Sequence, residues 1–224
     1  MRTDTSLVRL RLLQLFDSQF PVGAFAHSGG LETYAQEGAG LAELRELLRN
    51  QIDLGWGRLD LSAACLAWAA GADADSSAAL ARLSAIVHAY KIVPAVRDAS
   101  EKMGRRTLKL LKRLHPGIIG TLDVDPPHQA VVIGAAGRRL DLPRRDLLLS
   151  YAHSLTVSML TAATRCMPVS PDQTQELLLE LQPLLVIAVE RTLRGPQEVS
   201  FTCTPALDVR CQQQTLLRTR LFQS

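Results

Sequence analysis

Apolar residues recur at spacings of three and four along almost the whole chain, which is the pattern of helices that bury one face. The segment from Pro94 to Leu114 shows this most regularly, and it is followed by His115-Pro116-Gly117, where proline ends helical hydrogen bonding. One side of this helix is predicted to be apolar and the other basic. The apolar side comprises Met103, Thr107, Leu110, Leu111 and Leu114, and the basic side comprises Lys102, Arg105, Arg106, Lys109, Lys112 and Arg113.

The N-terminal part repeats the pattern in two further segments. In the first, Leu10, Leu13 and Phe16 fall on one side of a helix, and we expect that side to be its apolar face. The second runs from Leu41 to Leu59, and its two glycines, Gly55 and Gly57, are expected to bend or divide it.

Three more helices are expected in the C-terminal half. The segment from Pro143 to Cys166 is apolar on most sides and is therefore predicted to be central. Another begins at Pro171, reaches about Leu193 and is expected to kink at Pro183. The tail from Ala206 to Phe222 is again predicted to be helical.

No segment alternates in the way that strands do, and no internal repeat is present. The stretch "AVVI" (130–133) has strand-like composition but is short and isolated, so its surroundings are interpreted as a loop, a short apolar helix and a turn at Gly137-Arg138-Arg139. The prediction is an all-α, single-domain bundle of roughly eight to ten helices over residues 1–195, followed by a linker and tail over residues 196–224.

Composition narrows the class of protein further. Leucine and alanine dominate and aromatic residues make up only 4%, which favours helices packed through aliphatic side chains. A net charge of +3 is too small to indicate nucleic-acid binding. The irregular spacing of the four cysteines indicates reduced thiols in the cytoplasm. No run approaches the roughly 18 apolar residues of a membrane span.

The stretch "DSQFPVGAFAHSGGLETYAQEG" (17–38) has the residue types of a catalytic loop but lacks their arrangement. Ser28 follows His27, yet the first glycine of G-x-S-x-G is missing, and adjacent residues of a helix point about 100° apart. No Walker A loop occurs. No two histidines lie four residues apart on a helix, and none has a cysteine at ligand spacing, although a transient metal site across a subunit boundary stays open. No catalytic, cofactor or metal residue is therefore assigned.

A turn followed by a closely packed helix explains the same stretch better than a catalytic loop does. Phe20-Pro21-Val22-Gly23 fits a type I turn, with proline second and glycine fourth, and a helix is expected from about Ala24. One face of that helix has mostly small residues and suits close helix packing: Ala24, Ser28, Leu31 and Ala35. The opposite residues are expected to meet solvent or a partner protein: Glu32, Tyr34 and Glu37.

Three blocks of the sequence resemble the family of the urease accessory protein UreF. The N-terminal pattern is roughly L-L-Q-L, P-x-G-[AS]-[FY] and S-x-G-L-E, and "RDASEKMGRR" (97–106) is similar to the family's R-x-A-S-x-x-M-G-R-x helix. The end of the chain matches P-x-L-D-I and R-L-F-x-S. The matching positions are Leu12, Leu13, Gln14, Leu15, Pro21, Gly23, Ala24, Phe25, Ser28, Gly30, Leu31, Glu32, Pro205, Leu207, Asp208, Val209, Arg220, Leu221, Phe222 and Ser224.

The resemblance implies an all-helical, dimerising, non-enzymatic helper protein. Such proteins bind the accessory protein UreD or UreH, recruit the GTPase UreG and deliver nickel to apo-urease, so that nickel is relayed and not bound stably. The resemblance also implies partner binding through the terminal segments and one broad face. One departure concerns this tail, since Gln214-Thr215 and Leu217-Arg218 replace the family's usual His-Glu and Gln-Tyr.

We expect the tail to be ordered by a partner protein. Arg218 and Arg220 would pair with acidic groups, while Leu221 and Phe222 would enter an apolar pocket, and Glu32 with Tyr34 would form a second contact. Replacing Arg220 and Phe222 by alanine is expected to weaken co-purification of the partner.

Three alternatives stay open at this stage. One is a helical enzyme that uses His27 and Ser28, and another is a UreF-like protein with a changed partner. The third is a module whose basic face, Arg97 to Arg113, binds membranes or nucleic acid; the absence of interleaved aromatic residues argues against it.

Overall fold

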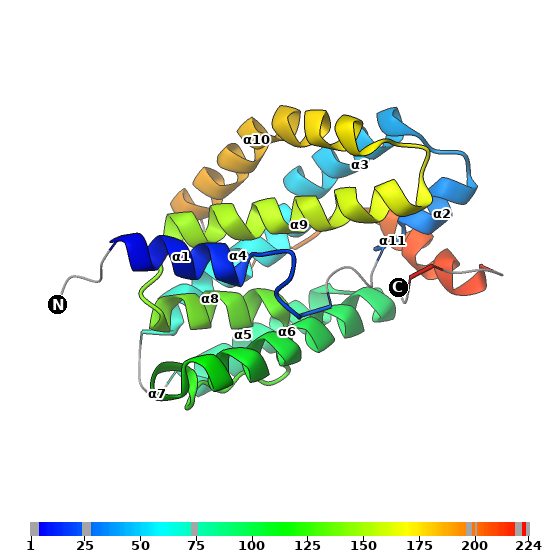
Figure 1. Cartoon of the computed structure of the whole chain (residues 1–224). Helices are drawn as coiled ribbons and strands as arrows, with labels where there is room; N and C mark the ends of the chain where they lie inside the picture. Colours follow the sequence, from blue (N-terminus) through cyan, green and yellow to red (C-terminus); the bar gives the residue numbers. More distant parts are fainter. Residues whose placement is uncertain are drawn as a thin grey trace.

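The computed structural model describes residues 5–23, 28–72, 76–195, 199, 201–217 and 221–222, and within these ranges every regular element is helical (Figure 1). The predicted all-α class is therefore confirmed. None of the helices in these ranges is both long enough and apolar enough to cross a membrane. The elements are α1 (Thr5–Leu15), α2 (Leu31–Gln36), α3 (Leu41–Asp53), α4 (Trp56–Ala70), α5 (Ser77–Tyr90), α6 (Pro94–Leu114), α7 (Pro116–Ile119), α8 (Gln129–Arg139), α9 (Arg144–Cys166), α10 (Pro171–Arg194), α11 (Pro205–Gln213) and the 3-10 helix η2 (Gln214–Leu216).

The centre of the molecule is the close pair of α4 and α8. Every residue of α8 from Ala130 to Gly137 is buried, and most of these residues are small. A Cβ atom on Gly134 would lie 2.1 Å from the carbonyl oxygen of Ala64 and 2.8 Å from Cβ of Ala67. The two helices can approach this closely only because glycine and alanine line their contact.

Other helices cover this pair on two sides. Helices α3, α9 and α10 pack together over α4, while α5 and α6 pack below α4 and α8 (Figure 1). The C-terminal α11 lies at one end of the bundle against the short α2, although the two are far apart in sequence. This arrangement brings the N-terminal motif and the C-terminal tail together.

Several predicted boundaries are confirmed. Helix α6 begins at Pro94 and ends at Leu114, and Gly55 separates α3 from α4. Helix α9 spans nearly the predicted segment and starts just after Pro143, and α10 begins at Pro171 and continues through Pro183.

Two predictions about the ends of helices are corrected. Gly137-Arg138-Arg139 was predicted as a turn, but it forms the last turn of α8, where the Arg138 guanidinium lies 4.5 Å from the centre of the Trp68 ring. On α6, Leu114 was expected on the buried face but is exposed, while Leu108 is buried. The buried stripe is therefore rotated relative to the one predicted from leucine spacing.

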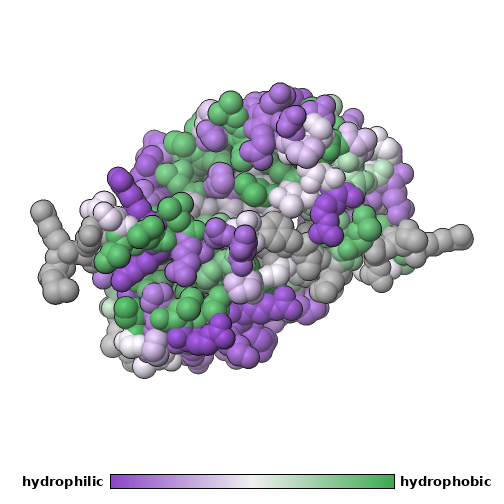
Figure 2. Space-filling view, in the orientation of Figure 1, coloured by the Kyte–Doolittle hydropathy of each residue, from purple (hydrophilic) through white to green (hydrophobic). Residues whose placement is uncertain are grey.

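The first helix departs from the expected orientation. Leu10 and Leu13 are 60% and 69% exposed, and Val8 and Leu15 are the residues that face the core. Figure 2 shows the resulting apolar surface over α1. Arg11 anchors this helix by donating a hydrogen bond of 3.0 Å to the carbonyl oxygen of Leu140.

Candidate functional site

The N-terminal motif forms a loop followed by a short helix. The Val22 N–H donates to the carbonyl oxygen of Phe20 at 2.8 Å, so the bond closes a tighter turn than the predicted type I turn, and Gly23 follows with a φ of 81°. Ala24 and Phe25 lie outside the described residues. The predicted helix from Ala24 is wrong at Gly29 and Gly30, whose φ values of 58° and 91° are left-handed, and α2 begins only at Leu31.

Gln214 joins this loop to the tail. Its Oε1 atom accepts hydrogen bonds from the Ser28 hydroxyl at 3.0 Å and from the Gly30 N–H at 3.1 Å, and its Nε2 donates to Oε2 of Glu32 at 2.7 Å. The other Glu32 oxygen accepts from the Leu221 N–H at 2.6 Å. Glu32 and Gln214 are only 5% and 2% exposed, so these bonds form in a region with little water.

Glycine makes this contact possible. A Cβ atom on Gly30 would lie 2.9 Å from the sulfur of Cys211 and 3.0 Å from Cδ1 of Leu207, both on α11. Helix α11 therefore packs directly on the backbone of the loop. The tail therefore docks on residues of the N-terminal motif of the same chain, namely Ser28, Gly30 and Glu32.

A second set of contacts surrounds the first. Thr33 Oγ1 donates to the carbonyl oxygen of Arg210 at 2.9 Å, and the Arg210 guanidinium binds Glu37 at 2.9 Å while lying 5.1 Å from the centre of the Tyr34 ring. These exposed and half-exposed contacts add less stability than the buried ones, because water screens them.

The predicted partner-binding residues are therefore placed differently from what the sequence indicates. Glu32 was expected to meet solvent or a partner but is buried beneath the tail, and Phe222 is 5% exposed within the chain itself, where Arg165 lies 4.8 Å from its ring centre. Leu221, in contrast, is 64% exposed. Arg218 and Arg220 lie outside the described residues, and whether a partner contacts this region stays a prediction.

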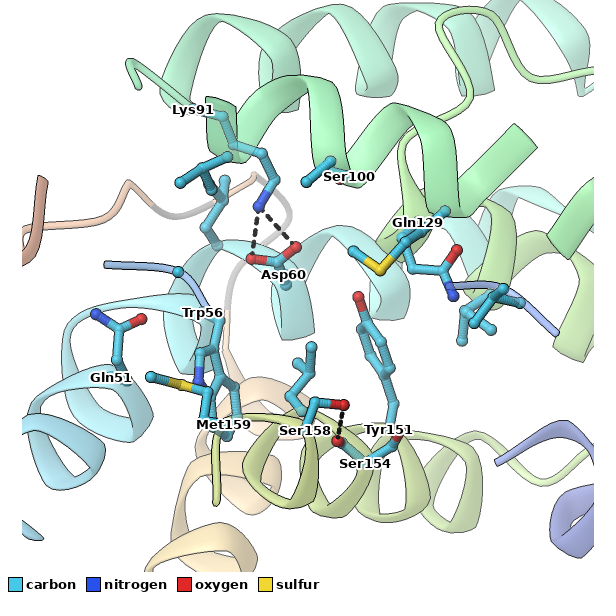
Figure 3. A pocket seen from close by; sticks show the side chains of 18 of the residues that line it. Gln51, Trp56, Asp60, Lys91, Ser100, Gln129, Tyr151, Ser154, Ser158 and Met159 are labelled. Carbon is cyan, nitrogen blue, oxygen red and sulfur yellow. Dashed lines mark hydrogen bonds and ion pairs between the residues drawn. The ribbon is translucent and has the colours of Figure 1, made fainter. Parts of the chain in front are cut away.

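A cavity of about 300 Å³ lies beside the docked tail and is lined by residues of several helices, including Cys211 of α11. Figure 3 shows Lys91 reaching Asp60 from one side and Tyr151 pointing toward Asp60 from α9. The Lys91 Nζ lies 2.9 Å from Oδ1 of Asp60, and both side chains are more than nine-tenths buried. Burial, and then the charge of Asp60, raise the pKa of Tyr151 well above its usual range.

Charge pairing, hydrogen bonding and burial hold the reactive groups near this cavity. Asp60 is paired with Lys91, and the Ser28 hydroxyl donates a hydrogen bond to the amide oxygen of Gln214. Burial raises the pKa of Cys211 to about 12 and that of Cys166 to about 11, so neither is a thiolate at neutral pH. The buried Trp56 indole N–H has no hydrogen-bond partner among the described residues, and it is a donor that a bound molecule could use.

One cluster of metal-ligating groups occurs among the described residues, and the sequence gives no sign of it. His88, Glu101 and His128 come from α5, from α6 and from the residue before α8. Their spacing along the chain follows no ligand pattern, because only the packing of α5 and α6 against α8 brings them together.

Within the described residues, the fold and the site define a helical protein whose own tail completes its N-terminal motif. Comparison with known proteins gives the family. The UreF family model matches residues 39–182. The urease accessory protein UreF of Nostoc sp. is 30% identical over 96% of this chain and 95% of its own length, and that of Actinobacillus pleuropneumoniae is 30% identical over 95% and 97%. UreF of Bacillus sp. strain TB-90 is 29% identical over 96% and 98%.

The chain belongs to the UreF family of urease accessory proteins.

Proposed function

We propose that this chain acts in urease maturation as a non-enzymatic scaffold. With UreD or UreH it recruits and regulates the GTPase UreG, and the assembly delivers nickel to apo-urease. The observation that carries this proposal is similarity to curated UreF proteins over 96% of this chain and 95–98% of the length of those proteins.

The chemistry of the chain supports a scaffold. Its sequence has no Walker A loop, so a nucleotide-dependent step would belong to a partner such as UreG. Two of the polar groups that line the cavity already have partners within the chain, since Asp60 pairs with Lys91 and Ser28 donates a hydrogen bond to Gln214. We further propose that the protein works as a homodimer in the cytoplasm and that nickel passes through the complex.

The docked tail supplies a surface for the partner. Leu216 and Leu221 are 81% and 64% exposed, and both sit next to the hydrogen bonds of Gln214 and Glu32. Exposed leucines held on an ordered support are suited to protein contact, because little conformational entropy remains to be lost on binding.

Complementation tests the proposal directly. The chain is expressed in cells that carry a urease gene cluster without its own ureF gene, and nickel-dependent urea hydrolysis is measured. We expect urease activity to return, and to require nickel in the medium. A stable chain that restores no activity and captures neither UreD/UreH nor UreG, even when these come from its own source, would contradict the proposal.

A further inference from the structure

Three side chains that commonly bind metal ions meet near the C-terminal end of α5. The Nδ1 atom of His88 lies 2.9 Å from Oε1 of Glu101 and 3.4 Å from Nε2 of His128, and that Nε2 lies 3.7 Å from the same Glu101 oxygen. A triangle with these edges has a point about 2.0 Å from each corner, which is the length of Zn²⁺ bonds to nitrogen and oxygen ligands. One ion could therefore contact all three atoms with little movement of the side chains.

The backbone holds His128 in place without help from an ion. Its N–H donates to the carbonyl oxygen of Pro126 at 2.9 Å, and the Ser84 hydroxyl donates to the same oxygen. The adjacent Pro127 rests on α6 at Gly104, where a Cβ atom would lie 1.7 Å from the Pro127 oxygen. Ligands on rigid supports bind an ion at a lower entropic cost.

A neighbouring hydroxyl sets the orientation of the His128 ring. The Nδ1 atom of His128 lies 3.2 Å from Oγ of Ser100, and a proton on Nδ1 donated to this oxygen leaves the lone pair of Nε2 directed at His88 and Glu101. Metal-binding histidines usually donate their other ring proton to such a group.

The cluster is also reachable from solvent. His128 is fully buried, but the side chains of His88 and Glu101 are 44% and 21% exposed. Without an ion, the Nδ1 atom of His88 lies within hydrogen-bonding distance of both the Glu101 carboxylate and Nε2 of His128. An ion in their midst would satisfy all three groups at once.

We propose that His88, Glu101 and His128 form an exchangeable site for one divalent transition-metal ion that accepts nitrogen and oxygen ligands, such as Zn²⁺ or Ni²⁺. Two imidazoles and one carboxylate are a donor set of this class, and water would complete the coordination. To bind the ion, His88 must carry its proton on Nε2, so that Nδ1 offers its lone pair. The site needs no partner protein, and so it stands or falls independently of the proposed function.

Calorimetric titration of the tag-free full-length chain tests the site, with Zn²⁺ and Ni²⁺ as probes and Mg²⁺ as the hard-ion control. We expect one equivalent of Zn²⁺ or Ni²⁺ to bind and Mg²⁺ not to bind. The substitutions His88→Asn and Glu101→Gln should each weaken binding at least about 100-fold, and Ser100→Ala about 10-fold through the ring orientation. As controls, His153→Asn and Cys203→Ser remove an exposed histidine and an exposed thiol elsewhere. Both should leave the affinity and the stoichiometry of metal binding unchanged.

Circular dichroism of each variant keeps the result interpretable. His88 is half-exposed, so His88→Asn should keep the helical content of the parent chain. The proposal is wrong if the parent chain shows no saturable binding of either ion. It is equally wrong if the folded variants His88→Asn and Glu101→Gln both still bind one equivalent of the ion with the affinity of the parent chain, since the ion would then bind elsewhere.

Discussion

The side-chain amide of Gln214 donates a hydrogen bond of 2.7 Å to the buried carboxylate of Glu32, across 182 residues of sequence. The bond ties the N-terminal family motif to the C-terminal tail. It also explains how glutamine fits at position 214, where the UreF pattern described above usually has histidine. A carboxamide can accept hydrogen bonds from the N-terminal motif and donate one to the Glu32 carboxylate.

Replacing Gln214 by leucine should release the tail. The change removes three hydrogen bonds and leaves the Ser28 hydroxyl, the Gly30 N–H and one Glu32 oxygen with fewer partners in a buried place. We expect the free energy of unfolding to fall by about 1–3 kcal/mol, measured by urea denaturation. Limited proteolysis should cut the tail faster. The neighbouring Gln213→Leu, at an exposed position, is the control and should leave both measurements unchanged.

Thiol labelling gives an independent view of the same contact. Cys203 is exposed and should react with a thiol reagent at once at pH 8, whereas Cys211 should react slowly because burial raises its pKa to about 12 and shields the sulfur. In Gln214→Leu the reaction of Cys211 should become fast. Equal labelling rates for Cys211 in the two proteins, followed by mass spectrometry, would show that the tail remains docked without Gln214.

The buried pair of Asp60 and Lys91 should matter far more than surface pairs. Lys91→Met leaves the Asp60 carboxylate buried without its partner, and we expect a loss of about 3–5 kcal/mol in the free energy of unfolding. Adding Asp60→Leu should recover most of that loss. Arg145→Met, which breaks an exposed pair with Glu190, should cost about 0–1 kcal/mol. Similar losses for the two single variants would argue that the cavity is well hydrated.

The close contact between α4 and α8 should tolerate no side chain at Gly134. In Gly134→Ala the new methyl group meets the backbone of Ala64, so the helices must move apart. We expect a net loss of about 1–3 kcal/mol in thermal or urea unfolding, even though alanine favours helices by about 1 kcal/mol. Gly117→Ala places its methyl group in open space and should be neutral or slightly stabilising.

If the proposed function is correct, Leu221 should contact a partner. Leu221→Ser should weaken binding of UreD or UreH by about 2 kcal/mol, roughly 30-fold in Kd, in a pull-down or calorimetric titration. The control is Leu179→Ser on α10, because Leu179 is 67% exposed and Leu221 is 64% exposed. Equal weakening by both substitutions, or none by either, would place the contact elsewhere.

Local features of the structure could be predicted from the sequence, and long-range ones could not. The limits of α6 and the break at Gly55 follow from proline, glycine and leucine spacing, because these act within a few residues. The exposure of Leu10 and Leu13 could not be foreseen, since periodicity marks an apolar face without saying what covers it.

The candidate sites depend on residues that meet only in the folded chain. Glu32 looks like a surface carboxylate until Gln214 and Leu221 are placed beside it, and Phe222 looks like an anchor for a partner although it is buried in its own chain. His88 and His128 are likewise brought together by helix packing alone. Neither composition nor spacing carries this information.

The contact between Glu32 and the tail has a consequence for biosynthesis. A ribosome makes Glu32 early, and its buried hydrogen-bond donors, Gln214 and Leu221, follow only 182 and 189 residues later. Until then the nascent N-terminal segment keeps its carboxylate in water. Emergence of the tail is therefore the event that permits this end of the molecule to close, and products truncated before Gln214 would be left open at the same place.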